Sequence, residues 1–240
     1  MNLAIIIPLA NEEATIFELC EDLKSNLNKL KVKYSVYFVI DKVSKDNTKK
    51  ILNDYITNNE SFNILWAPNN KNVVDAYING YKKAFSLNHD YFIEMDGGFS
   101  HLPCQIMRIT DKLKDGYDCV YGSRFIDKGE ILNSNPKRLF YSKFGTIISN
   151  ILLKTNYTDA TSGYQGFNRK TLERLLSFKL LSEGHFYQTE VKFLLKKMNY
   201  IEVPITYKNP SNSITKKVLI NSFKCLVHYT FINLNNDSCK

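Results

Sequence analysis

The chain contains 240 residues, of which 44% are hydrophobic, 13% aromatic and 23% charged. This composition excludes a disordered or collagen-like chain, and the length predicts one large domain with its own core. Lysine and arginine outnumber aspartate and glutamate by 32 to 24, which gives a net charge of +8. A basic surface favours partners that carry phosphate, although a general excess of lysine in the sequence would explain the charge equally well.

The cysteines and the N-terminal residues bear on cellular location. The five cysteines include no Cys-x-x-Cys pair, which favours a reducing compartment over a disulfide framework. The N-terminus shows neither the basic segment nor the cleavage site of a signal peptide. No apolar run reaches the roughly 18 residues that a membrane span needs. We therefore expect a cytoplasmic protein.

The first half of the chain alternates between short apolar runs and amphipathic stretches. The runs typical of buried parallel strands are residues 3–7, 34–40, 62–66, 91–95 and 117–121. The stretches with helical spacing are residues 12–30, 46–56 and 72–85, and Pro103 opens a further helix. This alternation predicts an α/β fold, a doubly wound and mostly parallel sheet with helices on both faces.

The second half has a different pattern. An amphipathic, apolar-rich stretch covers residues 138–154, and a segment rich in glycine, serine and threonine follows at 158–167. A helix is expected at 186–198 and a strand at 200–203. We divide the chain into a domain of residues 1–210 and a C-terminal amphipathic helical tail of residues 211–240.

Polar residues follow four of the predicted strands, at the end of the sheet where parallel α/β folds bind ligands. Asp41 and Asp96 would each be a turn or cap residue if it stood alone. Together, after neighbouring strands, they favour a nucleotide site, in which a carboxylate accepts hydrogen bonds from the ribose or base or coordinates a divalent cation. Arg124 follows another strand, where it would either hold a pyrophosphate or form a surface ion pair.

Further polar side chains lie near these positions. Gln188 and Glu190 come close to a predicted helix start, and Glu190 would act there as a general base or as a partner of the helix dipole. His101 would be a ligand or base, although a polar residue of a turn is the more common role. Glu94 shares a strand face with Asp96 and is interpreted as structural.

Seven blocks, in this order, resemble the family 2 glycosyltransferases of GT-A fold, and among them the branch of dolichol- and polyprenyl-phosphate mannose or glucose synthases. The blocks are residues 7–13 (IPLANEE), 39–48 (VIDKVSKDNT), 95–103 (MDGGFSHLP), 121–125 (YGSRF), 161–167 (TSGYQGF), 186–190 (FYQTE) and 202–205 (EVPI). The resemblance implies a nucleotide-sugar half at residues 1–125 and an acceptor half at residues 126–210.

The resemblance also implies roles for individual residues. The nucleotide-sugar site would comprise Pro8, Ala10, Glu12, Asp41, Lys42, Asp96, Gly97, Gly98 and Gln188. The catalytic residues would be Asp96, Glu190 and Arg124, with Asp96 also facing the metal.

The donor half departs from the family pattern. Lys42 stands where the family has a second aspartate, Gly98 replaces the last acid of the Asp-x-Asp motif, and residues 72–76 replace a glycine-rich loop. The site thereby loses two carboxylates and gains an ammonium group. We therefore expect Mg²⁺ or Mn²⁺ to be weakly required or not required, with Lys42 and Arg124 offsetting the charge of the diphosphate.

The expected function is transfer of a sugar from a nucleotide sugar to a polyprenyl-phosphate or glycan acceptor, with inversion. A lipid phosphate needs no base, whereas a hydroxyl acceptor would use Glu190. One alternative is a catalytically silent homologue that binds a nucleotide sugar or a partner protein. Another is a sugar nucleotidyltransferase, which would need a glycine-rich basic loop where residues 9–12 stand.

The two amphipathic segments bear on the partners. Residues 139–153 and 217–234 have apolar faces edged by basic residues, which is typical of helices that lie on a membrane surface. They would equally serve to pack on the core or to form a homo-oligomer interface. We expect a peripheral position on the cytosolic face of a membrane, and no nucleic-acid partner.

Overall fold

The computed structural model describes residues 1–133, 136–208 and 216–237. The strands are β1 (Asn2–Leu9), β2 (Lys33–Ile40), β3 (Phe62–Trp66), β4 (Tyr91–Glu94), β5 (Cys119–Ser123), β6 (Glu130–Ile131), β7 (Gln165–Asn168), β8 (Tyr200–Pro204) and β9 (Thr206–Tyr207). The α-helices are α1 (Ile16–Lys29), α2 (Thr48–Ile56), α3 (Val73–Ser86), α4 (Ile106–Lys114), α5 (Pro136–Leu153), α6 (Arg169–Leu176), α7 (Tyr187–Leu194) and α8 (Lys216–Asp237), and a short 3-10 helix, η1 (Pro103–Gln105), precedes α4.

The main sheet contains seven strands in the order β3-β2-β1-β4-β7-β5-β8. All of its neighbouring pairs are parallel except those of β7, which runs antiparallel to both β4 and β5. β6 and β9 form a separate parallel pair. The α/β class and the mostly parallel sheet predicted from the sequence are confirmed.

The antiparallel strand β7 has no counterpart in the sequence prediction. Gly166 lies at its centre, and a Cβ atom there would lie 2.4 Å from Ile109 on α4. The strand therefore needs a glycine where β-branched residues would normally mark a strand. Its short, glycine-containing sequence is typical of a loop, and only its position between two other strands makes it part of the sheet.

Each face of the sheet has its own apolar layer. One cluster joins the sheet to α1, α2 and α4, and the other joins it to α3, α6 and α7. α3 approaches the sheet most closely at Gly80, where a Cβ atom would lie 2.5 Å from Ile6. The start of α3 is fixed by Asn72, whose side chain accepts hydrogen bonds from the amides of Val74 and Asp75.

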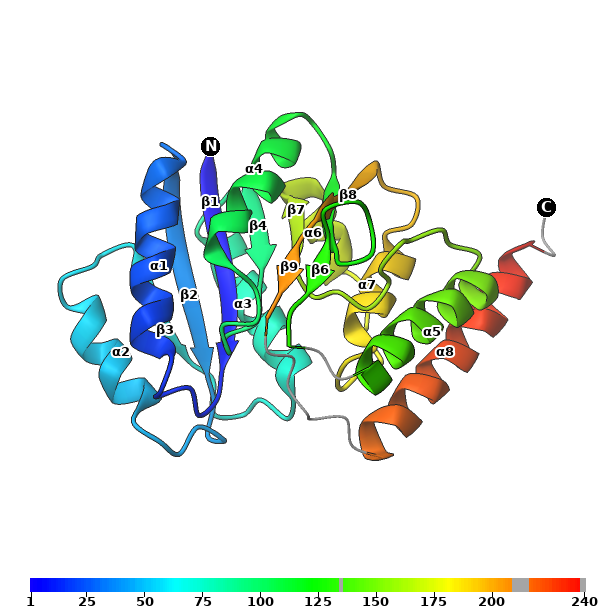
Figure 1. Cartoon of the computed structure of the whole chain (residues 1–240), viewed down its shortest axis with the longest axis horizontal. Coiled ribbons are helices and arrows are strands. Elements are labelled where there is room, and N and C mark those ends of the chain that lie inside the picture. The colour runs from blue at the N-terminus through cyan, green and yellow to red at the C-terminus, as the bar shows by residue number, and fades with distance from the viewer. Residues whose placement is uncertain (134–135, 209–215, 238–240) are drawn as a thin grey trace.

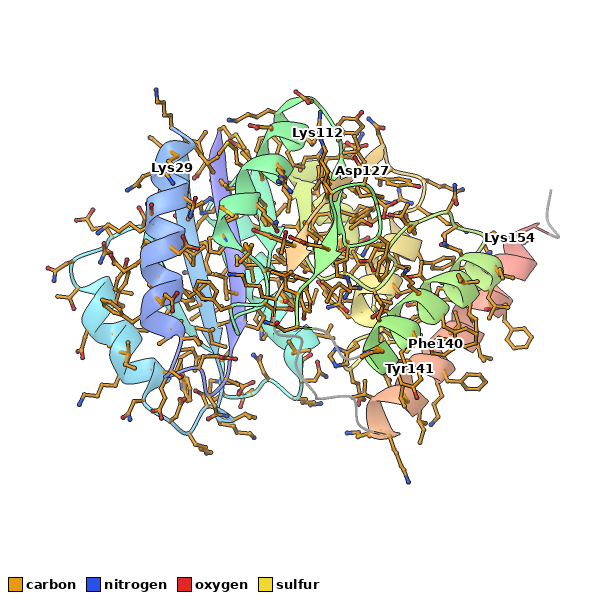
Figure 2. All side chains as sticks on the ribbon, viewed as in Figure 1. Lys29, Lys112, Asp127, Phe140, Tyr141 and Lys154 are labelled. Atoms are coloured by element: carbon orange, nitrogen blue, oxygen red, sulfur yellow. The ribbon has the colours of Figure 1, made fainter. Side chains whose placement is uncertain are left out.

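The helices α5 and α8 lie side by side at the end of the molecule opposite α2 and β3 (Figure 1). A small cluster around Leu153, Phe193 and Tyr229 packs this pair against α7. The remaining exposed surface of the pair carries large apolar side chains. In Figure 2, Phe140 and Tyr141 mark one end of α5 and Lys154 the other.

Candidate active site

A cavity of about 420 Å³ lies at the carboxyl ends of the strands, where the sequence predicts a site. The predicted site residues on its wall are Pro8, Glu12, Asp96, Gly97, Gly98, Arg124 and Gln188. The opposite wall comes from α5 and α8, with Tyr141, Gly145, Val218 and Leu219 among its residues. The cavity therefore joins the polar ends of the strands to the two outer helices.

The carboxylate of Asp96 is held by two tyrosines. Tyr77 on α3 and Tyr207 on β9 each donate a hydrogen bond to it at 3.2 Å. Its backbone amide donates to Nδ1 of His101 at 2.9 Å. Because Nδ1 accepts this bond, the His101 ring is neutral with its proton on Nε2. Burial lowers the pKa of His101, which keeps the ring neutral at physiological pH.

The two glycines after Asp96 bring the backbone close to β1. A Cβ atom on Gly97 would lie 2.6 Å from the carbonyl oxygen of Pro8, so a side chain would not fit. A Cβ atom on Gly98 would lie 3.3 Å from Oε1 of Glu12. The Glu12 carboxylate therefore stands next to the position where the family pattern has its last acid. Burial, with the charges of Asp46 and Asp96, raises the pKa of Glu12.

A divalent cation fits this donor set only in part. Asp96 and Glu12 offer carboxylate oxygens, whereas Mg²⁺ takes about six oxygen ligands and keeps several as water or substrate phosphate. In the part of the chain that the structure describes, no group of three or more His, Cys, Asp or Glu side chains could hold a metal ion. The protein would thus supply few of the ligands.

The loops after β1 and β2 are bound to each other. The amide of Glu13 donates to Asp46 at 2.9 Å, the amide of Asn47 donates to Glu13 at 2.9 Å, and the amide of Glu12 donates to Thr48 at 2.7 Å. The first two sequence blocks are therefore one structural unit. Asn11 adopts a left-handed conformation with φ of 59°, which turns the chain toward this unit.

Three residues predicted to bind the nucleotide sugar lie outside the cavity wall. Ala10 and Lys42 are exposed, and Asp41 accepts a hydrogen bond from the amide of Val43 at 2.8 Å. Asp41 thus makes the turn hydrogen bond of its alternative role, and its part in nucleotide binding stays a prediction. Since the exposed Lys42 is not on the wall, this structure does not support its substitution for a metal ion.

Arg124 lies on the cavity wall, but most of its hydrogen bonds go to one partner. Its Nε and Nη2 atoms donate to the two carboxylate oxygens of Asp159 at 2.6 and 2.7 Å, and Nη2 also donates to Thr161 at 2.6 Å. Both charged residues are buried. Burial raises the pKa of Asp159, but the charge and hydrogen bonds of Arg124 outweigh it and lower the pKa below its usual value. Arg124 therefore forms a buried ion pair, whereas the alternative expected from the sequence was an ion pair on the surface.

Glu190 does not lie on the cavity wall. Its side chain is fully buried and accepts hydrogen bonds from the amides of Leu181 and Ser182 and from the hydroxyl of Tyr229 on α8. This placement argues against the general-base role that the sequence predicts, because a base must reach the reacting group. Glu190 instead joins the loop before α7 to α8.

Two tyrosines on the cavity wall had no sequence signal for a site. Tyr77 and Tyr207 contact Asp96 from elements far apart in the sequence. Ser162 and Thr189 also lie on the wall; they belong to two of the sequence blocks, but no role was predicted for either residue. Tyr77 follows the ordinary spacing of a buried helix face, so only packing reveals its second role.

The fold of the chain matches that of solved glycosyltransferases of the GT-A class. The structure of glucosyl-3-phosphoglycerate synthase from Mycobacterium tuberculosis in complex with uridine diphosphate superposes with a TM-score of 0.69 and 12% sequence identity, over 95% of this chain and 80% of that chain. S. aureus TarS 1–349 gives a TM-score of 0.63 and 14% identity, over 95% and 65% of the two chains. At this identity the likeness concerns the fold alone.

Sequence comparison places the chain within this class. The family model "Glycosyl transferase family 2" matches residues 4–176, and the chain belongs to this family. It is 29% identical over 211 residues to undecaprenyl-phosphate mannosyltransferase of Micrococcus luteus, covering 86% of this chain and 84% of the relative. It is 30% identical over 217 residues to UDP-N-acetylglucosamine–dolichyl-phosphate N-acetylglucosaminyltransferase of Methanococcus voltae, covering 84% and 83%.

Proposed function

We propose that this glycosyltransferase moves a sugar from a nucleotide sugar to a polyprenyl phosphate, with inversion at the anomeric carbon. The observation that carries the proposal is the continuity of one cavity from the carboxylate of Asp96 to the apolar side chains of Tyr141 and Leu219. A polar donor and an acceptor with an apolar tail would each find matching walls. The names of both similar relatives contain a polyprenyl phosphate, although their sugars differ.

The proposed reaction needs no general base from the protein. An oxygen of the acceptor phosphate attacks the anomeric carbon, a new carbon–oxygen bond forms, and the bond to the diphosphate breaks with its electron pair on the leaving nucleoside diphosphate. The phosphate is already anionic, which agrees with the burial of Glu190 away from the cavity wall. The protein then acts mainly by holding the two substrates in line.

Positive charge for the acceptor phosphate would come from Arg124. Asp159 accepts two parallel hydrogen bonds from the guanidinium group, and this pairing is costly to rearrange. It therefore holds the group at one place on the wall. Asp96, held by Tyr77 and Tyr207, would orient the donor side. The substrates thus meet between a fixed cation and a fixed carboxylate.

A metal ion would have a limited part in this site. Mg²⁺ or Mn²⁺, when bound, would neutralise charge on the leaving diphosphate, and Asp96 with Glu12 are the residues that would hold it. Because the protein supplies so few ligands, the donor phosphates and water would supply the others. We therefore expect metal to bind with the nucleotide and only weakly without it.

The outer helices would place the protein on a membrane surface. The side chains of Phe140, Phe144 and Ile151 on α5, and of Phe223 and Phe231 on α8, are between 49% and 69% exposed. Among the described helices, none is long and apolar enough to cross a membrane. An apolar face with nearby lysines fits a peripheral contact with a membrane that carries the lipid acceptor.

Transfer to lipid tests the proposed function. The protein is incubated with UDP-, GDP- and CMP-sugars labelled in the sugar, with and without a polyprenyl phosphate in detergent. We expect label in the organic phase only with the acceptor and with one class of donor. Nucleotide binding without transfer to any acceptor would support the catalytically silent alternative. Transfer to a free glycan alone would overturn the lipid assignment.

A further inference from the structure

Two polar atoms, on two residues of the cavity wall, have no hydrogen-bond partner among the residues that the structure describes. One is the hydroxyl of Ser162, a residue that is 2% exposed, and the other is Oε1 of Gln188. Both residues belong to the cavity wall. Folded proteins leave few buried polar atoms unpaired, so two such atoms on neighbouring residues of one cavity wall point to a ligand that completes them.

The backbone of Ser162 and the side chain of Gln188 are each in contact with a buried neighbour. The backbone carbonyl of Ser162 accepts a hydrogen bond at 2.7 Å from the buried ammonium group of Lys192. The Gln188 side chain packs over Gly163, where a Cβ atom would lie 3.0 Å from Nε2. Gly163 thus leaves room for Gln188 beside Ser162. Residues that bind a ligand specifically need such supporting contacts from their neighbours.

The chemistry of the two atoms selects the group that they bind. Oε1 of Gln188 only accepts hydrogen bonds, whereas the Ser162 hydroxyl both donates and accepts. A phosphate in its dianionic form only accepts, so it leaves Gln188 unpaired. An apolar lipid tail pairs with neither atom. A hydroxyl group donates to Gln188 and accepts from Ser162 at the same time.

We propose that Ser162 and Gln188 form the subsite that binds a hydroxyl group of the transferred sugar. This inference rests on the proposed function and names the residues that read the sugar of the donor. The subsite lies beside Thr161, which receives a hydrogen bond from Arg124. The sugar hydroxyl and the acceptor phosphate would therefore lie on adjacent parts of the same wall.

Binding measurements separate the sugar from the nucleotide. The wild type, Ser162→Ala and Gln188→Met are titrated by calorimetry with UDP-glucose, UDP-N-acetylglucosamine, GDP-mannose and the matching nucleoside diphosphates. For the donor that the wild type binds most tightly, we expect each variant to lose about tenfold in affinity, as expected for one lost hydrogen bond. Affinity for the nucleoside diphosphate, which lacks the transferred sugar, should not change.

The matched control is Thr110→Val. It removes a hydroxyl that is also buried and has no partner among the described residues, but from α4 and outside the cavity wall. We expect its affinity for the nucleotide sugar to equal that of the wild type. If Thr110→Val lost as much affinity for the nucleotide sugar as the two site variants, the loss would reflect general destabilisation and the inference would be overturned.

Donor analogues that each lack one sugar hydroxyl complete the test. One analogue should bind the wild type about tenfold more weakly than the full donor does. The same analogue should bind Ser162→Ala with nearly the affinity that it has for the wild type, because the hydroxyl that Ser162 contacts is already missing. If the variants prefer the nucleotide sugar over the nucleoside diphosphate as strongly as the wild type does, the subsite is overturned and the proposed function is left intact. A wild type that binds no nucleotide sugar would overturn both.

Discussion

At the scale of single residues, the cavity combines a held carboxylate with a buried ion pair. Asp96 stays partly accessible while two tyrosines donate to it. Arg124 and Asp159 are both buried, so each ionised group depends on the other for its stability in the protein interior. The first residue is therefore expected to matter for activity, and the pair for folding as well.

Asp96→Asn tests the first expectation. The amide keeps the shape of the side chain but removes its charge, so we expect turnover to fall at least tenfold, or about 1.4 kcal/mol in the barrier. Because the residue is not fully buried, the melting temperature should change little. Steady-state kinetics and calorimetry measure the two quantities. Asp115→Asn, an exposed change at the end of α4, is the control, and full activity in Asp96→Asn would contradict the site assignment.

Asp159→Asn tests the buried ion pair. It leaves the Arg124 charge buried without its counter-ion, which we expect to cost about 3–5 kcal/mol of unfolding free energy at pH 7. The folded-state pKa of Asp159 is lower than its unfolded value, so its contribution is present above the ordinary aspartate pKa and lost as pH falls through the folded value. Urea unfolding of both proteins should show the difference shrinking in acid. A difference that does not depend on pH would contradict this origin.

At the scale of elements, α5 and α8 have two different faces. Their inner residues pack around Leu153 and Tyr229, and Glu190 accepts a hydrogen bond from Tyr229, which attaches α8 to the domain. Their outer residues remain apolar and exposed. A helix pair whose inner face is already packed has an outer face free for another partner, which we expect to be a lipid surface.

Substitutions on the outer face test this expectation. Phe140→Ser combined with Phe223→Ser removes two aromatic rings that are 61% and 67% exposed. We expect weaker binding to vesicles of mixed neutral and anionic lipid in a flotation assay, and little change in melting temperature. Phe17→Ser removes a ring that is 60% exposed on α1 and serves as the control. Unchanged flotation, or a shift from dimer to monomer in solution, would favour an interface between protein chains instead.

At the scale of the whole molecule, one sheet connects Asp96 with Arg124. β4 leads to Asp96, β5 leads to Arg124, and β7 pairs with both strands between them. The two residues thus belong to one cooperative unit, and a ligand in the cavity should stabilise the entire domain. Its stabilising free energy depends only on its concentration and affinity.

Thermal unfolding with the preferred nucleoside diphosphate measures this linkage. At a concentration of 100 times the dissociation constant, we expect about 2.7 kcal/mol of added stability. EDTA should reduce the shift by less than half, since the protein offers few metal ligands, and added Mn²⁺ should increase it. Lys42→Ala should behave as the wild type, because Lys42 is exposed and outside the cavity wall. Complete loss of the shift in EDTA would contradict the weak role of metal.

The sequence by itself determined the class of fold and predicted the place of the candidate site. Apolar runs, helical spacing and strand-end acids are local signals, because each depends on residues close together in the chain. They identified the parallel strands, and Asp96, Arg124 and Gln188 do lie on the wall of one cavity. The sequence blocks also indicated the family that the comparison confirms.

Only the tertiary structure decided how these residues are used. Glu190 and Gln188 lie two positions apart on one helix, yet one is buried against α8 and the other faces the cavity. Gly166 belongs to a strand because its neighbours in the sheet come from elsewhere in the chain. Burial and pairing depend on contacts between residues far apart in the sequence, and no local pattern records which of two polar side chains will face the interior.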